Sequence, residues 1–496
     1  MLSVLGFTTP HVDYHALAPE IIVAATLIVV LIVDLVSDRN RALLGTISGI
    51  GLLAAMVPIL TLAVDGTDRF VLSGNPGYVV DNFALTMKAL FIIAGYVVVL
   101  LSTNYIAEGD YYEGEYYFLL LTSVLGMVVM ASSRDLISIF IALETLSIPA
   151  YMLATWRKRD PKSNEAGLKY YLMGVFATAI MLYGMSLVFG VTGTTVLADI
   201  SAKLGSHTTP IVTLGIVFCV VGFAFKVSAV PFHTWAPDTY EGAPTPITAF
   251  LSVSSKTGGF VAILTLIFVG FFGQHDVWEP MMWALAVMTM TVGNLIALRQ
   301  TNVVRLFAYS SIAQAGYILA PLAVAGELST KQDSLSAVII YLLIYAAMNL
   351  GAFGVIIAVA RKTGSAELDS FNGLFEYAPG LTVVMTVFLF ALAGIPPLAG
   401  WFAKFEIFRA TANAGTSAGY VLAVAVGVNS VIALFYYARV AQAMWMQPAP
   451  DGDHRPVRVP PALTGALAIC VVAVVVIGVY PQLVAKLGDM ATFAFT

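Results

Sequence analysis

The sequence predicts an all-α polytopic membrane protein with about 14 transmembrane helices, and three observations support this fold class. The chain is 59% hydrophobic and only 11% charged, with a mean hydropathy of +0.88. Its apolar residues gather in runs of about 20, the length that an α-helix needs to cross a bilayer. Four charged residues, Glu144, Lys226, Lys256 and Lys404, lie inside such runs. Ionisable side chains at that depth are costly and usually mark an ion or proton path.

Each apolar run is long enough to form one span, and the runs follow one another with short connections. The twelfth and thirteenth are long for a single span, which indicates tilt or interruption. No connection is long enough for a soluble domain, so residues 1–496 are expected to form a single membrane domain. The first run lacks the charged flank of a signal peptide, so we expect it to be retained. In chain order the runs cover about 17–37, 43–64, 83–103, 116–132, 136–156, 166–190, 210–235, 246–272, 277–298, 303–325, 334–360, 379–409, 418–446 and 461–487.

The distribution of Lys and Arg predicts the orientation of these spans. If the N-terminus lies outside, the inner connections and adjoining span ends hold twelve basic residues and the outer ones six. Such an excess is expected on the cytoplasmic side. An even number of spans then places both termini on the outer side.

Cofactor motifs are missing from the sequence. Its two cysteines, Cys219 and Cys470, both lie in apolar runs and form no Cys-x-x-Cys spacing. A cysteine-ligated iron–sulfur cluster or zinc ribbon is therefore not encoded. The six histidines have no metal-ligand spacing, and no glycine-rich phosphate loop follows a predicted strand. We expect no redox cofactor, nucleotide or metal site in this chain.

The seventh span combines a lysine with a helix break. Pro231 follows Lys226 by five residues and should free the carbonyl of Val227. A freed carbonyl within a membrane must be satisfied by protein or water, so such breaks usually line a cavity. His233 could share a face with Lys226 if the helix were regular. A simple packing kink is the alternative.

The twelfth span repeats this combination. Pro396 and Pro397 should free the carbonyls of Leu392 and Ala393, and Lys404 follows within two turns. Broken helices at corresponding positions of two halves indicate a transport site built on a repeat. The repeat is inferred from this layout, because sequence identity between the halves is not evident.

The remaining charged residues within spans have open alternatives. Glu144 is predicted to pair with Lys226, either as part of a path or as a static ion pair. Lys256 lies in a serine-rich stretch that could hold water or serve as a helix contact of small residues. Lys169, near an inner span end, could join the path or extend to the interface. For Lys88 and Arg439 we expect extension to the interface.

These residues suggest a mechanism of proton transfer. Moving one charge through 100 mV costs about 2.3 kcal/mol. Breaking a buried ion pair changes the free energy by about 3–5 kcal/mol, enough to drive one proton against that potential. The row of lysines could then pass protons as each contact forms and separates.

Four stretches of the chain resemble the antiporter-like membrane subunits of respiratory complex I, the proton-pumping NADH:quinone oxidoreductase, a family related to Mrp-type sodium/proton antiporters. The resemblance runs over the whole chain. The stretches are Lys226–Pro246, with the sequence KVSAVPFHTWAPDTYEGAPTP, Glu165–Tyr171, Arg305–Ile312 and Gly394–Phe405.

The resemblance implies fourteen helices with two inverted five-helix repeats, about 116–272 and 277–446, which follow three helices over 17–103 and precede a last helix over 461–487. It implies that Glu144 and Lys226 form the charge pair of the family, that Lys256 is its central lysine and Lys404 its exit-side lysine, and that Lys169 is the additional lysine of the sixth span. Gln314 departs from the pattern, because histidine is common at that place. A proton-relay role there is therefore in doubt.

Further expectations concern partners and location. The resemblance implies a bacterial cell membrane and neighbouring antiporter-like subunits, with flavin, iron–sulfur clusters, NADH and quinone bound by other subunits of the complex. Phospholipid and protons are the other expected partners, and nucleic acid is not expected, since the sequence has no basic patch suited to it. The first alternative is an Mrp-type cation/proton antiporter subunit, and the second is a scaffold with fixed ion pairs.

Overall fold

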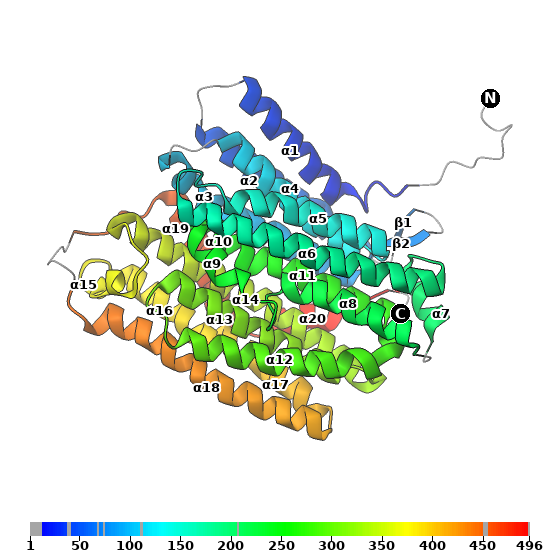
Figure 1. The fold of residues 1–496 in the computed structure, drawn as a ribbon. Coiled ribbons are helices and arrows are strands. Elements are labelled where there is room, and N and C mark those ends of the chain that lie inside the picture. Colours follow the sequence, from blue (N-terminus) through cyan, green and yellow to red (C-terminus); the bar gives the residue numbers. More distant parts are fainter. Residues whose placement is uncertain are drawn as a thin grey trace.

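The computed structural model is a bundle of membrane-length helices that run side by side (Figure 1). It describes residues 12–36, 41–66, 69–72, 75–109, 113–205, 208–449 and 455–494. Within these residues twelve helices are long and apolar enough to cross a membrane, and two shorter apolar helices, Pro210–Lys226 and Pro379–Ala393, accompany them. Each of the fourteen predicted runs therefore has a helical counterpart, and the predicted fold class is confirmed.

The helices of the first half follow the predicted runs within a few residues. They are α1 (Ala18–Val36), α2 (Arg41–Asp65), α3 (Asn82–Glu108), α4 (Glu113–Ser132), α5 (Leu136–Ala154), α6 (Pro161–Thr192), α7 (Leu197–Leu204), α8 (Pro210–Lys226), α9 (Trp235–Gly242), α10 (Thr245–Phe250) and α11 (Lys256–Thr265), with π-helical turns η2 (Leu251–Ser255) and η3 (Leu266–Gly270) on either side of α11.

The second half continues in the same way. Its helices are α12 (His275–Ala297), α13 (Val303–Leu319), α14 (Leu328–Thr363), α15 (Leu374–Tyr377), α16 (Pro379–Ala393), α17 (Ala399–Asn413), α18 (Ser417–Met446), α19 (Pro461–Val479) and α20 (Gln482–Met490), with short 3₁₀ turns at Phe272–Gln274, Ala320–Val324 and Leu368–Phe371.

Capping residues explain where several helices begin. Asp81, Asp135 and Asp160 each accept a hydrogen bond from a backbone N–H of the first turn, at α3, α5 and α6. Such caps satisfy donors that have no partner inside the helix. Thr209 and Asn302 cap α8 and α13 in the same way.

Both predicted breaks are present. The seventh span divides into α8 and α9, which are separated by residues 227–234, and the twelfth divides into α16 and α17, separated by residues 394–398. Each break contains the prolines that predicted it. The broken spans are the fourth members of the two predicted five-helix groups, but the inverted relation between those groups stays a prediction.

The structure corrects the sequence prediction at two places. The last run, predicted as one helix over 461–487, divides at Tyr480 into α19 and α20. Pro481 disfavours a helical conformation for the residue before it, which ends α19. The connection predicted over 65–82 contains an antiparallel hairpin of β1 (Arg69–Leu72) and β2 (Asn75–Val80).

The start of α1 and the C-terminal segment lie at the same end of the bundle as the start of α3. Tyr78 just before α3 donates to Glu20 of α1, and the backbone N–H of Phe83 donates to the carbonyl of Thr492. We call this the termini end. At the opposite end lie Arg157, Arg305 and Arg361, near the ends of α5, α13 and α14, and we call it the basic end.

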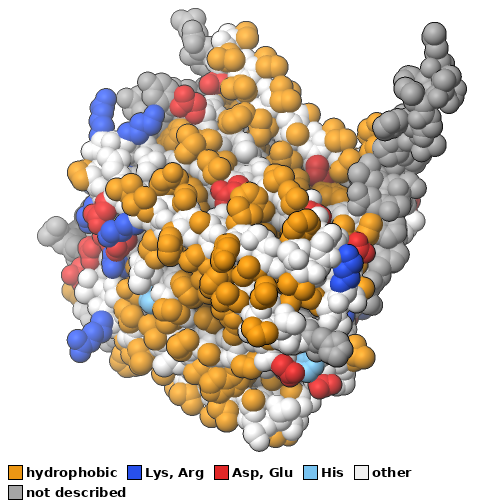
Figure 2. Space-filling view, turned by 45° about the vertical axis from the view of Figure 1, so that its right-hand side comes forward, with side chains coloured by type: hydrophobic (Ala, Val, Ile, Leu, Met, Phe, Trp, Pro, Cys, Tyr) orange, Lys and Arg blue, Asp and Glu red, His pale blue; other side chains and the backbone are white. Residues whose placement is uncertain are grey.

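Apolar side chains dominate the surface between the two ends. In Figure 2 hydrophobic side chains cover the middle of the face, and charged ones gather mostly toward its left and right edges. Large exposed apolar residues on α6 and α18, such as Phe176 and Phe435, belong to this surface. The chain is thus a multi-pass membrane protein whose polar ends face water.

Candidate functional site

Lys226 is the last residue of α8 and is buried at the break. Its Nζ donates to Ser147 Oγ at 2.8 Å and to Tyr170 OH at 3.3 Å. It also lies 5.7 Å from the ring centroid of Tyr170 and 6.0 Å from that of Tyr151. An ammonium group in this position is stabilised by hydroxyl acceptors and by aromatic faces.

Glu144 lies on α5, one turn before Ser147, and is half-buried. Its Oε1 is buried and accepts no hydrogen bond in the described part of the chain. The ion pair predicted between Glu144 and Lys226 is not formed within 4.0 Å among the described residues, although the two charges interact electrostatically. The prediction of direct contact is therefore wrong in this conformation, because the hydroxyl of Ser147 binds the ammonium group instead.

Lys256 begins α11 directly after the π-helical turn η2. Its Nζ donates to the backbone carbonyl of Ser311 at 2.6 Å and to Ser311 Oγ at 2.5 Å. Tyr345 donates to the same Oγ at 3.0 Å, and Tyr240 OH lies 3.5 Å from it. π-Helical turns occur often at functional sites, and this one sets the direction of the lysine toward α13.

Lys404 binds the break of the twelfth span itself. Its Nζ donates to the carbonyl of Ala393 at 2.9 Å and lies 4.8 Å from the ring centroid of Tyr317. The amide of Gln314 donates to the carbonyl of Leu392 at 3.4 Å. Leu392 and Ala393 are the residues whose carbonyls the two prolines were predicted to free.

Gln314 lies beside the break that Lys404 binds and contacts buried hydroxyls. Its amide nitrogen lies 3.2 Å from Tyr437 OH, and its amide oxygen accepts from Tyr341. Tyr437 OH lies 2.5 Å from Ser310 Oγ. An amide does not titrate, but it can fix the orientation of neighbouring hydroxyls.

A single helix, α13, therefore carries the polar contacts between two of the lysines. Ser310, Ser311, Gln314 and Tyr317 lie within two turns of that helix, and Lys256 and Lys404 reach them from different helices. We call the set of buried polar side chains from Lys226 to Lys404 the lysine row. The serine and tyrosine side chains of the row were not predicted. Their only indication in the sequence is the presence of serines and tyrosines within the apolar runs.

Two predicted site residues lie outside the lysine row. His233 is half-buried in the loop between α8 and α9, and its Nδ1 has no hydrogen-bond partner in the described structure. Lys169 has a side chain that is 43% exposed and forms ion pairs at 2.6 Å with Glu165 and with Asp238. Its position near the basic end agrees with the interface alternative.

Lys169 belongs to a charge cluster at the basic end that joins α6, α9 and α13. Arg305 binds Asp238 at 2.8 Å and Glu241 at 2.9 Å, and Lys162 binds Glu241 at 3.0 Å. Partial burial would raise the pKa of Asp238 and of Glu241, but hydrogen bonds from Lys169, Lys162 and Arg305 outweigh it and hold both values below the usual range. Both carboxylates are therefore ionised at neutral pH.

Lys88 is a second correction. It was expected to extend to the interface, but it is fully buried on α3, with its Nζ 2.6 Å from Glu20 Oε1. Tyr78 donates to the same oxygen at 2.7 Å. The carboxylate of Glu20 on α1 binds the ammonium group inside the bundle, so the Lys88 side chain does not need to extend to the membrane interface. Arg439 does reach the basic end, where it binds the carbonyls of Leu298 and Gln300.

The comparisons with known proteins agree with this geometry. A family model described as NADH:quinone oxidoreductase/Mrp antiporter, TM, matches residues 133–433. NADH-quinone oxidoreductase subunit N of Trichlorobacter lovleyi is 39% identical over 487 residues, which are 97% of this chain and 97% of that protein. The chain belongs to this family.

Other relatives within the subunit N family cover nearly as much of the chain. NAD(P)H-quinone oxidoreductase subunit 2 of Synechococcus elongatus is 38% identical and covers 93% of this chain and 88% of its own length. A chain in respiratory complex I from Thermus thermophilus has a TM-score of 0.78 at 30% identity, covering 95% of this chain and 99% of that one. The resemblance to antiporter-like subunits is thereby confirmed.

The wider antiporter fold is also shared. A chain of the Mrp complex from Dietzia has a TM-score of 0.85 at 22% identity, covering 97% of both chains. At that identity the likeness shows the fold alone.

Among the described residues, no group of three His, Cys, Asp or Glu side chains could hold a metal ion.

Proposed function

We propose that this chain is the proton-translocating membrane subunit of an NADH:quinone oxidoreductase and that protons pass along the lysine row. The observation that carries the proposal is that one helix, α13, places polar side chains at two of the buried lysines, since Ser311 binds Lys256 and Gln314 lies beside the break that Lys404 binds. Buried ionisable side chains joined by hydroxyls provide both sites for a proton and a route between them.

Each lysine has a defined role in this proposal. Lys226 receives or releases a proton beside Glu144, whose unsatisfied oxygen leaves room for a direct contact in another conformation. Lys256 is the central site, and Lys404 is the site at the second break. Rearranging a buried charge contact changes the free energy by about 3–5 kcal/mol, more than the roughly 2.3 kcal/mol that one proton needs against 100 mV.

His233 and Lys169 have weaker support. The unpartnered nitrogen of His233 could accept a proton at the break, since a neutral imidazole has one free lone pair. Lys169 is held by two carboxylates at the basic end, so its role would be at the surface of the path. The assignment of both to proton transfer stays a prediction.

Redox chemistry belongs to other subunits in this proposal. Relatives that cover the whole chain are named as subunits of NADH-quinone oxidoreductase, so we infer that flavin, iron–sulfur clusters, NADH and quinone are bound elsewhere in the complex. Neighbouring antiporter-like membrane subunits and phospholipid would cover the apolar surface. The location would be the bacterial cell membrane, with the basic end toward the cytoplasm and both termini outside.

Alanine substitution of the row tests the proposal in the assembled complex, reconstituted into vesicles with NADH and quinone. Lys256→Ala and Lys404→Ala should each reduce NADH-driven proton pumping at least tenfold while the complex still assembles. Lys486→Ala is the matched control, because that lysine lies exposed on α20. Pumping at the control rate in both row variants would refute the proposal.

The same vesicles separate the alternative of an Mrp-type antiporter subunit. An antiporter exchanges cations for protons without NADH and does not purify with flavin polypeptides. Sodium-dependent proton exchange by the isolated chain, with no NADH-driven pumping by its complex, would favour that alternative.

A further inference from the structure

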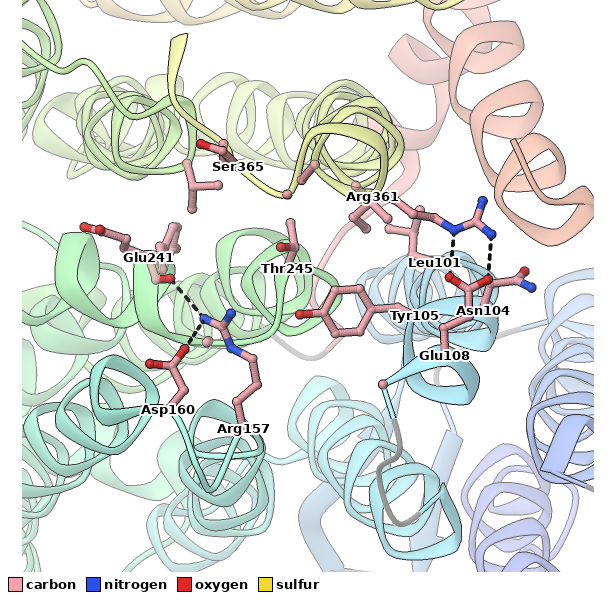
Figure 3. Close-up of a pocket in the computed structure, with 18 of the residues that line it drawn as sticks. Leu101, Asn104, Tyr105, Glu108, Arg157, Asp160, Glu241, Thr245, Arg361 and Ser365 are labelled. Atoms are coloured by element: carbon pink, nitrogen blue, oxygen red, sulfur yellow. Dashed lines mark hydrogen bonds and ion pairs between the residues drawn. The ribbon is translucent and has the colours of Figure 1, made fainter. Parts of the chain in front are cut away.

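A cavity of about 510 Å³ opens at the basic end of the bundle, among α3, α6, α9, α13 and α14 (Figure 3). We call it the vestibule. Tyr105 and Thr245 point toward its middle, while Glu108 and Arg361 lie on one side and Arg157 and Asp160 on the other. Charged and polar side chains of this kind make a cavity that water fills.

The charges that line the vestibule are balanced by one another. Arg361 binds Glu108 at 2.6 Å, and Arg157 lies 3.4 Å from Asp160 and donates to the carbonyl of Gly242 at 2.8 Å. Lys162 binds Glu241 at 3.0 Å. Since its cations are bound by carboxylates and a carbonyl, the vestibule offers no concentrated positive charge for an anion such as a lipid phosphate. Its chemistry fits water and protons.

Tyr240 is a residue of the vestibule wall that also contacts the lysine row. The residue is buried on α9 and lines the cavity. Its hydroxyl lies 3.5 Å from Ser311 Oγ, which accepts the hydrogen bond of Lys256 at 2.5 Å. The wall of the vestibule is therefore connected to Lys256 through the hydroxyls of Tyr240 and Ser311.

The hydroxyl of Ser311 has three hydrogen-bond partners, and these partners fix the direction in which its own proton points. A hydroxyl can accept two hydrogen bonds and donate one. Lys256 and Tyr345 both donate to it, so its own proton points to Tyr240. While Lys256 is charged, the chain of hydroxyls is therefore directed from the row toward the vestibule.

We propose that Tyr240 is the residue through which protons pass from the vestibule to Lys256. This inference rests on the proposed function and adds the point of proton uptake to it. Once Lys256 has passed its proton onward, its neutral amine no longer donates to Ser311, and the two hydroxyls can turn so that Tyr240 donates to Ser311 and Ser311 donates to Lys256. The amine then accepts the Ser311 proton, and Ser311 accepts that of Tyr240. Tyr240 takes a proton from water in the vestibule, so the sequence transfers one proton and leaves both hydroxyls neutral.

The sequence motifs that predicted the family hold this contact together. Thr248 donates to the carbonyl of Tyr240 at 2.8 Å, and Arg305 ties α9 to α13 through Asp238 and Glu241. The motif of residues 226–246 thus carries Tyr240, and the motif of residues 305–312 carries Ser311. The two motifs therefore meet at the contact between these hydroxyls.

Replacing the tyrosine hydroxyl tests the proposal. In the reconstituted complex, Tyr240→Phe should lower the NADH-driven pumping rate at least fivefold and raise the solvent deuterium isotope effect on that rate, because proton uptake becomes limiting. Tyr240→His should restore part of the rate, since imidazole can relay a proton. Tyr105→Phe removes a hydroxyl from the same vestibule and should leave both values unchanged.

A second test does not depend on Tyr240. A cysteine placed by Thr245→Cys, labelled with a bulky membrane-impermeant thiol reagent, should slow pumping at least fivefold, whereas the unlabelled variant pumps normally. The natural cysteines, Cys219 and Cys470, are buried.

The outcomes separate this inference from the function beneath it. If Lys256→Ala abolishes pumping while Tyr240→Phe and labelled Thr245→Cys pump at the wild-type rate, the uptake route is wrong and the function stands. If Lys256→Ala and Lys404→Ala both pump at the control rate, the function itself fails.

Discussion

The hydroxyl groups of serine and tyrosine determine how two of the buried lysines, Lys226 and Lys256, are held in this protein. Lys226 donates to Ser147 and Tyr170, and Lys256 donates to Ser311. A hydroxyl can both accept and donate, whereas a carboxylate partner would hold the positive charge in place. These hydroxyls therefore stabilise the ammonium groups of Lys226 and Lys256 without preventing them from giving up a proton.

Lys88 provides a residue-scale prediction, because its charge is held by a single carboxylate. Lys88→Ala would leave Glu20 buried beside an apolar gap and should reduce the free energy of unfolding by about 3–5 kcal/mol. Thermal unfolding of the assembled complex measures this loss. The double variant Lys88→Met with Glu20→Leu should recover most of it, and equal melting temperatures for Lys88→Ala and the unmodified protein would contradict the assignment.

Gly394 provides a second prediction at this scale. Its φ of +93° favours glycine, and an added Cβ would lie 2.8 Å from Cδ of Lys404. Gly394→Ala should therefore cost about 1–3 kcal/mol in backbone strain and displace the lysine from the carbonyl of Ala393. We expect the NADH-driven pumping rate to fall although the variant keeps most of its folding stability. Gly380→Ala in α16, where a Cβ meets nothing within 4 Å, is the control, and matching pumping rates for the two variants would exclude the effect.

At the scale of elements, the two broken spans solve the same problem differently. In the twelfth span, the lysine itself binds a carbonyl beside the break. In the seventh span, the indole N–H of Trp235 and the backbone N–H of Ser228 bind the carbonyl of Phe225, which leaves Lys226 free to bind hydroxyls. Backbone groups inside a membrane must be satisfied by protein or water, and both solutions meet that requirement.

Small residues hold α6 against α8 closely, and this contact positions the break that follows α8. A Cβ on Gly184 would lie 2.7 Å from the carbonyl of Gly215, which is too close for either helix to remain in place. Gly184→Leu should overpack the contact and lower the melting temperature of the complex by several degrees, since overpacking costs about 1–3 kcal/mol. Gly190→Leu on the same helix has open space around it and should be tolerated. Equal melting temperatures would show that the helices can separate freely.

For the whole molecule, the charge cluster at the basic end joins α9 of the first five-helix group to α13 of the second. The vestibule lies beside this junction, and the lysine row extends from α8 to α17 in the interior of the bundle. The two groups therefore meet at both a surface ion cluster and a buried hydroxyl contact. A change in one helix group can be transmitted to the other through α9, because this helix carries Asp238 and Glu241 of the ion cluster and Tyr240 of the hydroxyl contact.

Acid should loosen this junction. The folded pKa values of Asp238 and Glu241 lie below their unfolded values of about 4. The cluster therefore stabilises the fold at pH values above about 4–5, and this contribution is lost as the pH falls. Melting temperatures measured from pH 7 to about pH 3 should fall less steeply for Asp238→Asn than for the unmodified protein, with the difference appearing below about pH 4. Parallel curves would show that the carboxylate does not contribute.

The sequence by itself determined the spans, the two breaks and the family. The free energy of placing apolar residues and prolines in a bilayer depends mainly on local composition, so about 20 residues suffice to predict each helix. The sequence also identified Lys226, Lys256 and Lys404, because an ionisable residue in an apolar run is conspicuous without any structure.

Only the tertiary structure decided which groups these lysines contact. Nothing in the sequence indicates that Ser311, Tyr240 and Tyr345 meet, and three separate helices bring them to Lys256. The same holds for Lys88, whose partner on α1 is 68 residues away. Hydrogen bonds depend on distances of a few tenths of an ångström between distant segments, and local composition does not contain that information.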